Sequence, residues 1–109
     1  MKQYALAVDM PDDSKLIEKY IQHHKNVWPE VLKSIRDSGI TNMKIYHIGN
    51  RLYMHLTVED DFSFEQKNKM DLANPIVQKW ERLMSQYQIP IPWARSCQKW
   101  TPLNLIFDY

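Results

Sequence analysis

The spacing of apolar residues divides the chain into alternating strands and helices. The short apolar-rich segment 3–10 (QYALAVDM) predicts a strand. After it, a stripe with spacings of 1, 3, 1 and 3 residues predicts a helix over about 14–25, capped by Asp12 or Asp13. The stripe consists of Leu16, Ile17, Tyr20, Ile21 and His24.

A proline and a glycine set the bounds of a second helix. Pro29 disfavours helical geometry at Trp28 and suits the first position of a new helix, which we expect to run to about Asp37. Gly39 is typical of a helix C-terminal stop. The side chains that this helix is expected to bury are Val31, Leu32 and Ile35.

Two strands follow, over about 41–48 and 51–59, joined by the two-residue hairpin signal Gly49-Asn50. Pairing across that turn places Ile48 opposite Arg51 and His47 opposite Leu52. Both faces of the hairpin then carry large side chains, which indicates a sheet covered on both sides. The first face holds Met43, Ile45, His47, Leu52, Met54 and Leu56, and the second holds Lys44, Tyr46, Tyr53 and His55.

The second half of the chain repeats this plan. Ser63 begins a capping-box motif for a helix over 64–72, and Asn74-Pro75 starts another helix with an apolar stripe that includes Trp80. The alternation in 99–109 predicts a final strand. The residues that alternate there are Leu103, Leu105, Phe107 and Tyr109.

The resulting order, β-αα-β-β-αα-β, predicts an α+β fold of the ferredoxin-like type within one domain, 1–109. Such a fold has a four-stranded antiparallel sheet with its helices on one face. No helix remains to cover the second face, so we expect a second copy of the chain to pack there, sheet against sheet.

Composition and charge exclude several classes of protein. The chain has 109 residues with 14 basic and 13 acidic side chains, and this balance gives no basic surface for nucleic acid or an anionic membrane. Its apolar runs are too short for a signal peptide or a membrane span. Cys97 is the only cysteine, which excludes an intrachain disulfide and fits a cytoplasmic location. Two glycines are too few for a phosphate-binding loop.

His24 is the first candidate for chemistry. It follows Tyr20 by four residues, so both side chains lie on the same face of the predicted helix. Imidazole transfers protons near neutral pH, and an adjacent phenol would make an acid–base pair. The alternative is a hydrogen-bonded core histidine packed against a tyrosine, and the spacing alone favours that alternative.

The other candidate functional residues indicate a function less clearly. His23 and His24 point in different directions, and His47 and His55 fall on opposite sheet faces, so we expect no metal site. Trp80 could stack on a flat ligand or pack in the core. Asp60 and Asp61 are explained by helix capping, although paired carboxylates also suit acid–base work.

The segment 18–30 (EKYIQHHKNVWPE) resembles the signature of the L-rhamnose mutarotase family, a tyrosine, a histidine four residues on, and then Trp-Pro-Glu. Three further segments resemble the same family, and together they cover nearly the whole chain. They are 39–46 (GITNMKIY), 74–84 with Trp80 inside it, and 105–108 (LIFD).

The resemblance implies a homodimeric α/β barrel, joined through the sheets, that interconverts the α and β anomers of a 6-deoxy pyranose without a cofactor. It implies that His24 is the proton donor, that Tyr20 binds the sugar and that Trp80 lines its pocket. L-Rhamnose is the sugar expected first. L-Fucose is the alternative, because Met43 and Glu81 stand where some family members have a tyrosine and a second tryptophan.

Two other functions fit the same fold. One is a small cofactor-free monooxygenase or haem-degrading enzyme, for which an aromatic pocket would suit a flat substrate. The other is a sugar-binding or interaction module without catalysis. The fold does not separate these from an isomerase, and the Tyr20–His24–Trp28 string is what favours the mutarotase.

Overall fold

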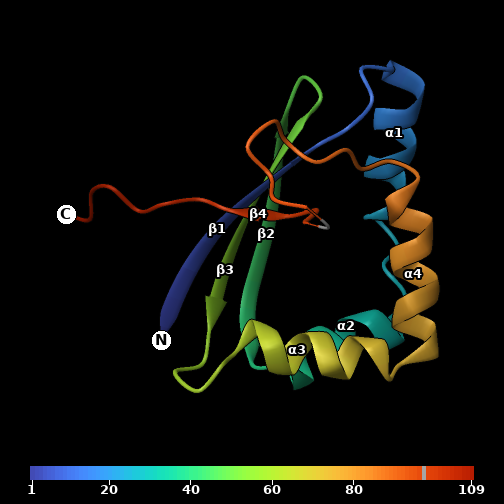
Figure 1. The fold of residues 1–109 in the computed structure, drawn as a ribbon. Helices are drawn as coiled ribbons and strands as arrows, with labels where there is room; N and C mark the ends of the chain where they lie inside the picture. Colours follow the sequence, from blue (N-terminus) through green and yellow to red (C-terminus); the bar gives the residue numbers. More distant parts are fainter. Residues whose placement is uncertain (97) are drawn as a thin grey trace.

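The computed structural model describes residues 1–96 and 98–109, and Cys97 lies outside the described residues. The order of elements is the predicted one, a strand, two helices, two strands, two helices and a strand (Figure 1). The elements are β1 (Lys2–Asp9), α1 (Ser14–His23), α2 (Pro29–Asp37), β2 (Ile40–Ile48), β3 (Arg51–Val58), α3 (Phe64–Leu72), α4 (Pro75–Ser85) and β4 (Thr101–Pro102).

The strands form one antiparallel sheet in the order β2-β3-β1-β4. This order confirms the ferredoxin-like prediction. The hairpin register is also confirmed, because Ile48 pairs with Arg51 and His47 pairs with Leu52. Gly49 has a φ of +54°, a left-handed conformation that glycine adopts without strain.

Short polar side chains begin three of the four helices. The Asp13 carboxylate accepts hydrogen bonds from the N–H groups of Lys15 and Leu16, and the Ser63 hydroxyl oxygen accepts one from Gln66. Asn74 caps α4 in the same way. At the other end of α2, Gly39 stops the helix with a φ of +97°. These local signals explain why the predicted bounds of α2 and α3 agree with the structure.

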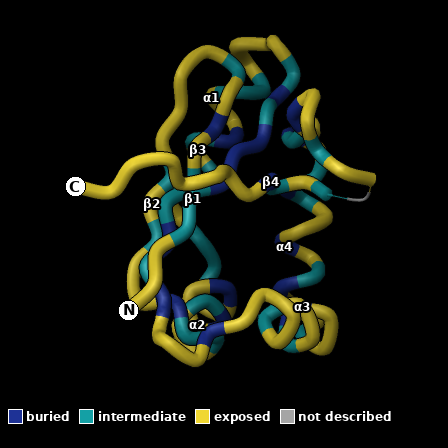
Figure 2. The backbone as a smooth tube through the Cα atoms, turned by 60° about the vertical axis from the view of Figure 1, so that its left-hand side comes forward, coloured by how far each residue is buried: buried dark blue, intermediate teal, exposed yellow. Residues whose placement is uncertain are grey.

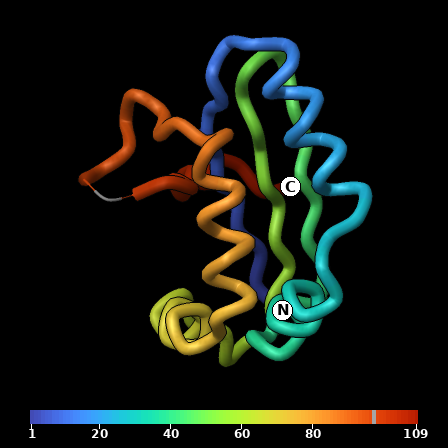
Figure 3. The backbone as a smooth tube through the Cα atoms, turned by 90° about the vertical axis from the view of Figure 1, so that its right-hand side faces the viewer, coloured from blue at the N-terminus to red at the C-terminus, as the bar shows by residue number. Residues whose placement is uncertain are grey.

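All four helices lie on one side of the sheet. Figure 3 looks onto that side, where α1 and α4 stand over the strands while α2 and α3 cross their lower end. The main core cluster joins the sheet to α1, α2 and α4, and a smaller cluster lies toward the lower end. The main cluster contains Val8, Met10, Tyr20, Val31, Leu52, Trp80, Met84 and Tyr87.

The predicted core of α2 is wrong at one position. Val31 is buried and Ile35 is half-buried, but Leu32 is 50% exposed, and the buried position one turn after Val31 is Ser34. The helix contacts β2 and α4 through the face that carries positions 31, 34 and 35. Leu32 lies about 100° around the helix from Val31 and faces away from that contact.

The predicted C-terminal strand is also largely wrong. Only Thr101 and Pro102 form strand β4 beside β1, the Leu103 N–H donates one more hydrogen bond of 2.8 Å to the Ala5 oxygen, and the chain then leaves the sheet on the side opposite the helices (Figure 1). This tail is exposed along its whole length (Figure 2). Alternating apolar residues form a strand only where they pair with a neighbouring strand, and beyond Leu103 the tail turns away from residues 2–4 of β1, along whose outer edge it could have continued.

Removing the α4 cap should measurably destabilise the fold. We expect Asn74→Ala to lower the free energy of unfolding by about 1 kcal/mol, because it leaves the N–H groups of Ile76 and Val77 without their acceptor. The measurement is urea unfolding followed by tryptophan fluorescence. Lys79→Ala, an exposed change on the same helix, should shift the free energy by less than about 0.5 kcal/mol. Equal effects of the two changes would contradict this role for Asn74.

Candidate functional site

A cleft of about 1530 Å³ lies between the inner face of the sheet and the helices. Its walls come from all four helices and all four strands, so residues that are far apart in sequence meet there. Typical small-molecule sites are about 300–1,000 Å³, so a small ligand would fill only part of it. The three predicted site residues, Tyr20, His24 and Trp80, all line this cleft.

His24 sits at the C-terminal end of α1, where it is the capping residue and not a member of the helix. Its Nδ1 lies 2.9 Å from the main-chain oxygen of Tyr20, one turn back. A carbonyl oxygen only accepts, so Nδ1 carries the proton and Nε2 carries the lone pair. Nε2 has no hydrogen-bond partner among residues 1–96 and 98–109.

The surroundings of His24 favour its neutral form. Partial burial lowers its pKa below the ordinary value of 6.5, the hydrogen bond to Tyr20 opposes this, and the neighbouring His23 adds a smaller lowering. A neutral imidazole with a free Nε2 is a proton acceptor at neutral pH. Once protonated, the same nitrogen is a donor.

The Tyr20 phenol lies beside the His24 ring, so that one ligand in the cleft could contact both side chains. The two rings lie 4.5 Å apart between centroids, and the Gln88 amide donates a hydrogen bond of 3.2 Å to the Tyr20 oxygen. Burial raises the pKa of Tyr20, while the Gln88 bond opposes the rise. The phenol therefore keeps its proton and remains able to donate it to a ligand oxygen.

Trp80 completes this group from the middle of α4. Its ring centroid lies 5.6 Å from that of His24 and 5.2 Å from that of Trp28, both in edge-to-face geometry. The side chain is only 8% exposed and belongs to the main core cluster. Trp80 therefore packs in the core, and it also lines the cleft, where stacking on a ligand stays a prediction.

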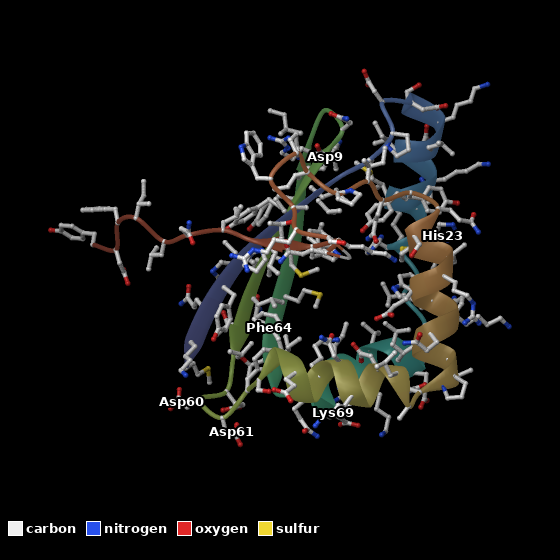
Figure 4. All side chains as sticks on the ribbon, viewed as in Figure 1. Asp9, His23, Asp60, Asp61, Phe64 and Lys69 are labelled. Carbon is white, nitrogen blue, oxygen red and sulfur yellow. The ribbon has the colours of Figure 1, made fainter. Side chains whose placement is uncertain are left out.

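The other histidines do not join the site. His23 does not line the cleft, and its Nε2 lies 3.3 Å from the Tyr87 hydroxyl, while His55 pairs with Gln3 on the outer sheet face. Figure 4 labels His23 between α1 and α4. Within the described part of the chain, no group of three histidine, cysteine or acidic side chains could hold a metal ion. Asp60 and Asp61 lie in the exposed turn below the sheet (Figure 4).

Sequence analysis missed a polar group in the same cleft. Asp71 at the end of α3 is buried and receives Lys67 Nζ at 2.5 Å and the Ser34 hydroxyl at 3.3 Å. Glu81 on α4 is close to this pair, since burial first and then the Asp71 charge raise its pKa, while Lys67 opposes the rise. The available signal was a lysine and an aspartate four residues apart on a helix that lacks a clear apolar stripe.

The two departures noted in the sequence both face the cleft. Met43 on β2 and Glu81 on α4 are among its lining residues. The cleft therefore has a chemically different wall at these positions from one built of a tyrosine and a tryptophan.

None of the described helices is both long and apolar enough to cross a membrane.

Comparison with known proteins points to one family. Residues 3–109 match the family model described as L-rhamnose mutarotase. An L-fucose mutarotase from Xanthomonas campestris pv. campestris is 35% identical over 109 residues, covering 98% of this chain and 87% of that protein. An L-rhamnose mutarotase from Burkholderia ambifaria is 29% identical over 70 residues, covering 62% of this chain and 64% of the relative.

A solved structure supports the same fold. The L-rhamnose mutarotase of Formosa agariphila matches with a TM-score of 0.73 at 21% sequence identity, covering 100% of this chain and 99% of that one. The matches to the family model and to the Xanthomonas protein extend over nearly all of the sequence. The chain belongs to the L-rhamnose mutarotase family.

Proposed function

We propose that this chain is an isomerase that interconverts the α and β anomers of a 6-deoxy-L-hexopyranose and needs no cofactor to do so. The observation that carries the proposal is the state of His24. Its Nδ1 donates a hydrogen bond to the Tyr20 carbonyl oxygen, burial lowers its pKa, and its Nε2 has no hydrogen-bond partner among the described residues, although the side chain lines a cleft. Mutarotation needs one such group beside the anomeric carbon.

The names of the relatives support two sugars. The Xanthomonas relative is named for L-fucose, and the Burkholderia relative is named for L-rhamnose. The two sugars share the ring and the methyl group and differ in configuration at C2 and C4. A test of the proposed activity therefore needs both L-rhamnose and L-fucose as substrates.

The reaction moves one proton between two oxygens that are bonded to the same carbon. In our proposal, Nε2 of neutral His24 takes the proton from the anomeric hydroxyl. The imidazolium then gives a proton to the ring oxygen as the bond from C1 to that oxygen breaks, which yields the open-chain aldehyde. Rotation about C1–C2 and reversal of the same transfers close the ring as the other anomer. No proton is gained or lost overall.

Tyr20 and Trp80 would position the sugar for this exchange. The Tyr20 oxygen accepts from Gln88, so its own proton is available to a sugar hydroxyl or to relay the second transfer. The exposed part of the Trp80 indole offers an apolar surface for the C–H face of the ring. Holding C1 within reach of Nε2 matters because proton transfer requires hydrogen-bond distance.

His24→Ala tests the proposal, with His23→Ala as the matched control. We expect His24→Ala to slow exchange between anomers by ~10²–10⁴-fold, the usual contribution of a positioned acid–base group. His23→Ala should stay near the wild-type rate, because His23 contacts Tyr87 and does not line the cleft. The measurement is saturation-transfer NMR on L-rhamnose and L-fucose, with circular dichroism to confirm folding.

Three results would contradict the proposal that the chain is a mutarotase in which His24 transfers the proton. Wild-type exchange in folded His24→Ala would remove His24 from the mechanism. Sugar binding by the wild type without any accelerated exchange would indicate a binding module. A spectral shift on adding haem, again without exchange, would favour the haem-binding alternative.

We also propose that the protein acts as a homodimer joined through the outer sheet face. Tyr46 is 55% exposed and Ile48 is 80% exposed on the hairpin, on a face that no described helix covers. The tail leaves the sheet on that side (Figure 1), and its apolar side chains are exposed. Those of the tail are Leu105, Ile106, Phe107 and Tyr109. Several large apolar side chains exposed on one side of a protein favour association.

A charge on this face should separate the copies. We expect the wild type to sediment at twice the mass of one chain, and Tyr46→Lys to raise the dimer dissociation constant at least about tenfold, because a buried ammonium lacks a partner there. Leu72→Lys is the control, since Leu72 is similarly exposed but lies on the helical side. A monomeric wild type, or a dimer unaffected by Tyr46→Lys, would contradict the sheet-face dimer.

A further inference from the structure

The α3 helix faces the cleft with polar side chains. Phe64, Lys67, Asn68 and Asp71 all line the cleft, and their spacing of 3, 1 and 3 residues is that of one helical face. A helix that only closes a core would place apolar residues on this face. On α3 the inward face is mainly hydrophilic, which is the composition of a wall that meets a polar ligand or water.

Hydrogen bonds to Asp71 hold the ion pair on this face in place. Asp71 accepts Lys67 Nζ at 2.5 Å on one carboxylate oxygen and the Ser34 hydroxyl at 3.3 Å on the other. The Gln78 amide donates to the main-chain oxygen of Asp71 at 2.9 Å. The Asp71 and Lys67 side chains are 7% and 21% exposed. Stability alone explains such a pair poorly, because removing two charges from water offsets most of their attraction.

Lys67 keeps donors to spare. Among residues 1–96 and 98–109, Asp71 is the one hydrogen-bond partner of its ammonium group, which carries three N–H bonds. The nearby Asp71 charge neutralises the ammonium, so the group suits a neutral hydroxyl better than a phosphate or carboxylate. Glu81 and Lys99 are the charged groups close to this pair, so two acidic and two basic side chains gather here and leave no net positive charge for an anion.

The ion pair and His24 both lie next to α4, close together along its axis. His24 contacts Trp80 on α4, and the main-chain oxygen of Asp71 accepts a hydrogen bond from Gln78, two residues (a rise of ~3 Å) before Trp80 on the same helix. A pyranose lying along α4 with C1 at His24 would direct its opposite edge toward α3. The ring atom directly opposite C1 is C4.

We propose that Lys67, positioned by Asp71, donates a hydrogen bond to the C4 hydroxyl of the sugar and determines which C4 configuration the enzyme accepts. This inference rests on the proposed mutarotase function. Lys67 is then a specificity-determining residue and Asp71 is a positioning residue. The expected ligand is a neutral hexose, and sugar phosphates and uronic acids are expected to bind poorly.

L-Fucose and its C4 epimer, 6-deoxy-L-glucose, test this directly because they differ at C4 alone. We expect wild-type kcat/KM for anomer exchange to differ at least about tenfold between the two sugars. Lys67→Met should reduce the ratio to within about threefold, mainly through KM for the preferred sugar, with kcat changed little. A site that hydrogen-bonds a hydroxyl discriminates strongly against substrates that misplace it.

Matched variants separate this role from a structural one. Lys69→Met lies on the exposed side of the same helix and should keep the wild-type ratio. Asp71→Asn should lower the ratio as Lys67→Met does. If the single variants fail to fold, the double variant Lys67→Met/Asp71→Leu removes both charges together and should fold without recovering discrimination.

The outcomes distinguish the inference from the function beneath it. A wild type that accelerates exchange of no sugar overturns the mutarotase proposal and this inference with it. A wild type that accelerates exchange but discriminates less than about threefold, or a folded Lys67→Met that keeps the wild-type ratio, overturns the role of Lys67 and leaves the mutarotase proposal intact.

Discussion

The hydrogen bond from His24 Nδ1 to the Tyr20 carbonyl oxygen is the contact on which the proposed chemistry depends. Its acceptor lies in the last turn of α1, where the Tyr20 oxygen also accepts a longer hydrogen bond of 3.3 Å from the main-chain N–H of His24. It fixes the tautomer, turns Nε2 to the ligand side and holds the imidazole against Tyr20 and Trp80. Without it the ring could rotate, and neither nitrogen would have a defined role. The backbone of α1 thus orients the group that we propose transfers the proton.

The cleft around this hydrogen bond has an aromatic part and a polar part. Aromatic rings from α1 and α4 surround His24, while the charged and amide side chains of α3 line another part of the same cleft together with Glu81. One helix, α4, borders both parts and therefore sets the distance between them. An apolar surface next to clustered hydrogen-bonding groups is what a deoxy sugar requires, since it has a hydrophobic C–H face and a hydroxylated edge.

Much of the fold followed from the sequence because the signals are local. Asp13, Ser63 and Asn74 cap their helices, and Gly39 and Gly49 provide the turns, whatever surrounds them. The contact between Tyr20 and His24 could also be predicted, since helical spacing alone brings these side chains together. The exposure of Leu32, the course of the 103–109 tail and the Asp71 ion pair could not be predicted from the sequence. Each depends on a tertiary neighbour, namely the face that α2 presents to α4, a strand partner beyond Pro102, and the approach of Ser34 to α3.

The most direct test of the account is the protonation state of His24, read from long-range proton–nitrogen NMR spectra recorded as a function of pH. The account predicts the Nδ1–H tautomer at neutral pH and a pKa below 6.5, because burial lowers it more than the Tyr20 bond raises it. Neutral His24 then predominates above that pKa, and exchange should slow as the pH falls through it. An Nε2–H tautomer, or a pKa well above 6.5, would contradict the central claim.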